Sequence, residues 1–225
     1  MNQFIHVQKG IKKIMIAQIV AIVSTVFSSV LSFLLLLLGI NVSSAEYSGP
    51  ELIWITIYAV LGFCSVVAIV VTMIISIWGF LQASKDEPEF KKAMICTAVS
   101  GTVLVFGSVF HIPNGAIYTI LTSVASIVEM FVAIFGLSGM IIIADRCERS
   151  DVKASGNFWM KIMVLTYFII SINALVIRIF ELSSQARMIS AIFGVFDLVL
   201  SASQYIIFWM YSRKVLHMLK HYQEG

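Results

Sequence analysis

Six long apolar runs divide this chain, and they constrain its fold more than any other feature of the sequence. The runs cover residues 14–40, 52–83, 93–110, 116–144, 158–180 and 188–212. Each is at least about 18 residues long, which at about 1.5 Å per helical residue is enough to cross a hydrocarbon core about 30 Å thick. The pattern predicts a polytopic membrane protein.

The cationic residues orient the predicted spans. Of the 15 lysines and arginines, all but Arg178 and Arg187 fall on the side shared by the two termini and the segments near 84–92 and 145–157. These residues are Lys9, Lys12, Lys13, Lys85, Lys91, Lys92, Arg146, Arg149, Lys153, Lys161, Arg213, Lys214 and Lys220. Cytoplasmic loops carry an excess of Lys and Arg, so the sequence predicts that both termini are cytoplasmic.

Composition supports a single transmembrane domain over residues 1–225. Hydrophobic residues make up 60% of the chain and charged residues 12%, far from the balance of about half and about a quarter in soluble domains. The net charge of +3 is spread along the cytoplasmic rims, where topology and anionic lipid headgroups explain it. We therefore expect the lipid bilayer, and no nucleic acid, as a partner. The first run is longer than a signal-peptide core, which favours an uncleaved span over a cleaved leader.

The starts of the first, third and fifth predicted helices are alike. Residues 13–18, 92–97 and 161–166 each begin with Lys, have Met two residues later, and end with Gln or Thr. The pattern predicts an all-α bundle of six transmembrane helices, arranged as three consecutive hairpins over about 1–85, 86–157 and 158–225. The alternative is that any helix starting at the cytoplasmic face tends to have Lys followed by aliphatic residues.

Three charged residues lie inside the predicted spans at one depth. Glu129 and Asp197 each stand sixteen residues before the cytoplasmic charge that follows their span, a rise of about 24 Å. Arg178 stands seventeen residues after Lys161, a rise of about 25 Å. Charges at such depth should face protein or water rather than lipid.

Two interpretations of these charges remain open. Glu129, Asp197 and Arg178 would line a recess that binds a cation, a proton or a zwitterionic solute. Alternatively, Arg178 forms a structural ion pair with one of the two acids, or with Glu181 one turn along its own helix.

No catalytic or metal-binding pattern accompanies them. Cys64 and Cys96 lie in apolar runs, Cys147 lies in a loop, and no Cys/His cluster has ligand spacing. The segment 136–139 resembles the GxSG motif of rhomboid proteases, but the sixth run lacks the histidine that would activate Ser138. We expect no enzymatic activity, no metal and no cofactor.

The segment 86–93 has the sequence Asp-Glu-Pro-Glu-Phe-Lys-Lys-Ala, which is typical of a helix N-terminus and would also suit docking of a soluble partner. This segment and the three-hairpin plan resemble small six-helix membrane proteins of Gram-positive bacteria that have no assigned activity. The resemblance implies a bacterial plasma membrane.

Two functional classes follow from these observations. In the first, the protein moves or captures a small solute or ion, as a transporter or as a membrane substrate-capture subunit. In the second, it is a non-catalytic interaction or regulatory protein that binds another membrane protein or a second copy of itself through faces rich in small residues.

Overall fold

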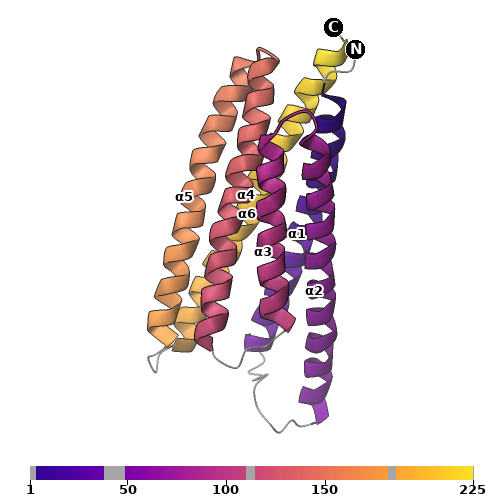
Figure 1. The fold of residues 1–225 in the computed structure, drawn as a ribbon. Coiled ribbons are helices and arrows are strands. Elements are labelled where there is room, and N and C mark those ends of the chain that lie inside the picture. The colour runs from indigo at the N-terminus through magenta and orange to yellow at the C-terminus, as the bar shows by residue number, and fades with distance from the viewer. Residues whose placement is uncertain (1–3, 38–48, 110–114, 182–185, 225) are drawn as a thin grey trace.

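The computed structural model describes residues 4–37, 49–109, 115–181 and 186–224. In these ranges the chain forms six α-helices and no strand, so the prediction of an all-α fold is confirmed (Figure 1). The helices are α1 (Ile5–Leu37), α2 (Gly49–Ala83), α3 (Glu89–Val109), α4 (Gly115–Arg146), α5 (Ser150–Glu181) and α6 (Ala186–Glu224).

The six helices form a closed ring in chain order. Each helix packs against the next, and α6 returns to pack against α1. Helices α4 and α6 also touch each other, so the ring is narrowed on that side. A ring of this kind leaves an inward face on every helix.

Both termini lie at the same end of the bundle (Figure 1). The turns between α2 and α3 and between α4 and α5 lie at this end too, at the top of the view. These are the segments in which the sequence concentrates its lysines and arginines, so we call this the basic end.

Five of the six helices are long and apolar enough to span a membrane. The candidate spans among the described residues are Ile5–Phe27, Leu52–Ala83, Ser123–Arg146, Ser150–Asn173 and Gly194–Tyr222. Helix α3 has 21 residues and carries Glu89, Lys91 and Lys92 in its first turn. The expectation of six spans is thus supported for five.

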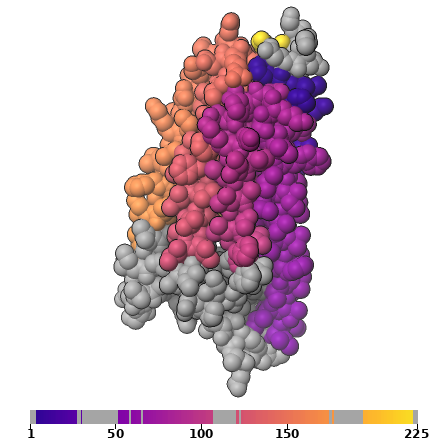
Figure 2. All heavy atoms as spheres, in the orientation of Figure 1, coloured from indigo at the N-terminus to yellow at the C-terminus, as the bar shows by residue number. Residues whose placement is uncertain are grey.

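The outer surface of the ring is apolar. Phe63 of α2 is 71% exposed, and Ile120 of α4 and Phe168 of α5 are more than half exposed. Helices α2 to α5 lie side by side on the face shown in Figure 2. Large apolar groups facing outward on several helices would be unfavourable in water but are ordinary in lipid, which is compatible with an integral membrane protein.

A close approach of two backbones fixes α1 against α2. A Cβ added to Gly10 would lie 2.5 Å from the carbonyl oxygen of Gly79 and 2.8 Å from the Cβ of Ala83. Only glycine fits at such a distance, so Gly10 and Gly79 let these helices pack more tightly than side chains would allow.

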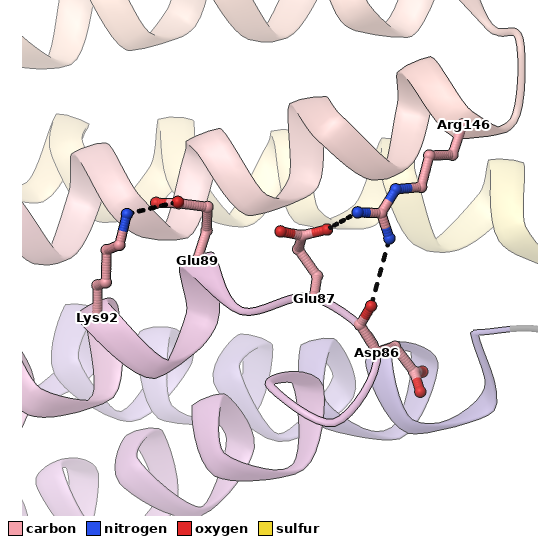
Figure 3. Close-up of polar contacts among 5 residues, drawn as sticks. All are labelled: Asp86, Glu87, Glu89, Lys92 and Arg146. Carbon is pink, nitrogen blue, oxygen red and sulfur yellow. Dashed lines mark hydrogen bonds and ion pairs between the residues drawn. The ribbon is translucent and has the colours of Figure 1, made fainter.

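The loop between α2 and α3 contacts both α1 and α4 at the basic end, and Figure 3 shows its contacts with Arg146 of α4. The Asp86 carboxylate accepts a hydrogen bond of 2.9 Å from the backbone N–H of Val7 in the first turn of α1. Glu87, which is 2% exposed, pairs with Arg146 at the end of α4 at 2.7 Å. The sequence predicted capping chemistry here, and the structure shows that Asp86 caps α1 rather than the helix that follows it.

Candidate functional site

A cavity of about 430 Å³ lies inside the helix ring. All six helices contribute to its wall. The polar groups in the described lining are Gln18, Ser24, Thr25, Thr72, Ser76, Thr97, Ser100, Glu129, Tyr167, Gln204 and Tyr205. Its volume falls within the range of about 300–1,000 Å³ that is usual for small-molecule sites.

The spacing of these residues explains why they meet. On α3, Thr97, Ser100, Gly101 and Leu104 recur every three or four residues, which places them on one helix face. On α2, Thr72, Ser76 and Phe80 follow one another at intervals of four residues, so they also share one helix face. Small or polar side chains on these inward faces leave room where larger ones would fill the ring.

Glu129 of α4 is the acidic group of the described cavity wall. The Ser100 hydroxyl donates a hydrogen bond of 3.3 Å to its Oε1 atom and also lies 3.5 Å from the Ala125 carbonyl oxygen. Tyr167 of α5 and Tyr205 of α6 interact electrostatically with Glu129. Side chains from four helices, α3 to α6, therefore line the cavity together with or around this carboxyl group.

Several buried polar atoms of the cavity wall have no hydrogen-bond partner within the described structure. They are Oε1 of Gln18, Oγ1 of Thr72 and Nε2 of Gln204, and the Gln204 side chain is only 6% exposed. The large majority of buried side-chain polar atoms in proteins have a hydrogen-bond partner. Unpaired donors and acceptors on one cavity are therefore the arrangement expected of groups that bind a ligand or ordered water.

Of the three charged residues singled out in the sequence, the structure puts Glu129 on the cavity. Asp197 is half-buried, is absent from the described lining, and is hydrogen-bonded by the side-chain amide of Asn173. The side chain of Arg178 lies outside the described residues. A site that unites all three remains a prediction.

Two further depressions differ in character from the central cavity. One, of about 790 Å³, lies between α4 and α5 and is lined mostly by apolar side chains such as Ile127 and Leu165. The other, of about 350 Å³, lies at the basic end and includes Arg149, Arg213 and Lys214. Neither combines buried unpaired polar atoms with an acid, so the central cavity is the strongest candidate site.

Groups suited to metal binding do not gather in the described part of the chain, where no three His, Cys, Asp or Glu side chains come together. Burial raises the pKa of the Cys147 thiol, and the nearby Arg149 opposes this to a smaller extent. A thiol held protonated in this way is a poor nucleophile. The expectations of no cofactor and no enzymatic activity stay predictions.

Comparison with known proteins adds no relative: no family model matches the chain, and no curated protein or solved structure gives a significant match. The resemblance to small six-helix membrane proteins of Gram-positive bacteria also remains a prediction.

Sequence reasoning missed most of the cavity wall. Gln18 and Thr97 were noted only as matching positions of a repeat, and both face the cavity. Their third counterpart, Thr166, is absent from the described cavity lining. Both threonines donate to the carbonyl oxygen four residues earlier on their own helix. The internal repeat is thus still a prediction. Uncharged amides inside apolar runs, Gln18 and Gln204, were the available signal for the cavity.

Proposed function

We propose that this chain is a six-span protein of the plasma membrane with both termini in the cytoplasm. The support is the gathering of both termini and both turns between hairpins at the basic end, combined with the excess of Lys and Arg on cytoplasmic loops. Helix α3 completes the ring between α2 and α4, and its 21 residues rise about 32 Å, enough to cross with them.

Within this topology the protein binds a small solute or ion in the central cavity, as a transporter or a substrate-capture subunit. The observation that carries the proposal is a cavity of about 430 Å³ with buried polar atoms of Gln18, Thr72 and Gln204 left unpaired. Unpaired buried polar groups destabilise a fold. A membrane protein whose only role was to pack against partner proteins would gain stability if apolar side chains replaced these unpaired polar groups.

Gln204→Leu separates a binding role from a structural one. Removing a buried amide whose Nε2 atom is unpaired should leave the thermal unfolding midpoint unchanged or raise it. The same variant should lose the stabilisation that a bound solute gives the wild-type chain. The measurement is thermal unfolding in detergent against a panel of amines, amino acids, sugars, carboxylates, Na⁺ and K⁺.

Gln82→Leu is the matched control, because Gln82 also has a buried unpaired Oε1 atom but does not line the cavity. It should keep every solute effect of the wild type. If no solute stabilises the wild type, or if Gln204→Leu keeps the effect, the cavity is not the binding site. The second functional class, an interaction protein binding another membrane component, would then be favoured.

The proposed topology has its own test. A reporter that is active only in the cytoplasm should work when fused to either terminus. Labelling of tags at both termini from outside intact cells would contradict the orientation.

A further inference from the structure

We infer that the central cavity selects a small organic cation, an ammonium compound that also carries a hydrogen-bonding group. This inference rests on the proposed solute site and names its substrate class. It follows from the charge of the cavity wall, from its apolar and aromatic surface, and from the polar atoms that remain unpaired.

The charge of the cavity wall disfavours binding of anions in the cavity. Glu129 is acidic, and the described lining contains no Lys, Arg or His. The Lys13 ammonium of α1 is absent from this lining and lies over the Trp78 ring, 3.5 Å from its centroid. A carboxylate within a bilayer needs a partner of opposite charge, because the low dielectric strengthens both attraction and repulsion. A cationic ligand beside Glu129 would supply that partner, whereas an anion would be repelled.

The size and surface of the cavity favour an organic cation over a bare metal ion. Its volume equals that of about fourteen waters at about 30 Å³ each. No cluster of three ligating side chains stands in the described part of the ring to replace the hydration shell of a metal. Aromatic rings of Phe80, Tyr167, Tyr205 and Phe208 line the wall, and such rings attract ammonium groups through their negative faces.

The unpaired atoms define the rest of the ligand. Gln18 offers an acceptor, Gln204 a donor, and the Thr72 hydroxyl either one. A ligand hydroxyl, amide or ammonium N–H would satisfy these atoms, whereas a purely apolar cation would leave them unpaired. The site therefore recognises both the charge and a polar group of its ligand.

A set of probes with matched shapes tests this inference. The probes are choline, its neutral carbon isostere 3,3-dimethylbutan-1-ol, and the anion 3,3-dimethylbutanoate, titrated into the full chain in lipid nanodiscs. We expect choline to bind at least about tenfold more tightly than the isostere, and the anion to bind more weakly than both. Glu129→Gln should abolish the preference for choline over the isostere and leave binding of the isostere unchanged.

Asp197→Asn is the matched control, because Asp197 is a half-buried acid of the same bundle that does not line the described cavity. It should keep the preference for choline. If Glu129→Gln does not fold, the comparison of choline with its isostere in the wild-type chain still decides the question.

Equal binding of choline and the isostere, tighter binding of the anion, or no binding of choline would each overturn the inference. These results differ from failure of the proposed function. The solute panel would still show stabilisation that depends on Gln204 if the cavity binds a ligand of another class, and would show none if the cavity is not a binding site.

Discussion

The basic end of the bundle and its middle differ in the pairing of their buried polar groups, although Oε1 of Gln82 at the end of α2 is also buried without a partner. At the basic end the buried carboxylate of Glu87 is paired with Arg146, and the buried Tyr211 hydroxyl donates to the Val152 carbonyl oxygen at 3.3 Å. In the middle, polar atoms of Gln18, Thr72 and Gln204 are buried without partners around a cavity. The same six helices form both regions.

Packing differs between the two regions as well. The basic end holds a continuous core in which Val7, Phe90, Leu137, Ile143 and Val215 are fully buried. Toward the middle this core borders the cavity, and the residues that belong to both are Phe80, Ala133, Met163 and Phe208. The comparison shows a tightly packed end that holds the ring together and a middle that keeps space open. The two regions should therefore respond differently to substitution.

The largest expected effect contrasts a core leucine with a cavity leucine. Leu137→Ala, at a position with 0% exposure, should lower the free energy of unfolding by about 2–5 kcal/mol, because the cavity it leaves loses packing contacts on all sides. Leu104→Ala should lower it by less than about half as much, because Leu104 is only partly buried and borders an existing cavity. Equilibrium unfolding in detergent compares them, and equal losses would contradict the contrast.

Breaking the buried ion pair should have the next largest effect. Arg146→Ala leaves Glu87 buried and unpaired, so we expect the free energy of unfolding to fall by about 2–3 kcal/mol. Breaking a fully buried pair costs about 3–5 kcal/mol, and the effect should be smaller here because Arg146 is half exposed. Adding Glu87→Gln should recover most of the loss. Lys153→Ala breaks the exposed pair with Asp145 and should change stability by less than about 1 kcal/mol. Thermal unfolding of these three variants and of the wild-type chain measures these differences.

Removing the cap of α1 should have a moderate effect. Asp86→Ala takes away the acceptor of the Val7 N–H and should cost about 0.5–2 kcal/mol. Hydrogen exchange of the first turn of α1 should rise while exchange at the cavity-lining part of α3 stays constant. Faster exchange in both places would mean that the loop also supports the cavity.

The smallest expected effect is an increase in the stability of the protein. Glu148, after α4, has φ 56°, and the bonds Arg149 N–H to Ala144 C=O and Glu148 N–H to Asp145 C=O form a Schellman motif around it. Glycine has no Cβ penalty in this conformation, so Glu148→Gly should stabilise the protein by about 1 kcal/mol. A higher unfolding midpoint without any change in solute binding would confirm that the two regions are independent. A lower midpoint would show that the Glu148 side chain has a role of its own.

The sequence by itself predicted the helices, an apolar surface compatible with a membrane, and the position of the basic end. These properties follow from residue type along the chain, since an apolar run of sufficient length forms a helix wherever it meets lipid. It also identified Glu129 as an acid inside a predicted span, but it gave Asp197 the same weight.

Only the tertiary structure decided which polar groups share a space. Gln18, Ser100 and Gln204 come together because each helix has a particular rotation within the ring and because α6 closes onto α1. Hydropathy is nearly equal around helices that face lipid on one side and apolar protein on the other, so it carries little information about that rotation. Asp197 and Glu129 are alike in sequence, but the structure places Glu129 on the described cavity wall and Asp197 beside Asn173.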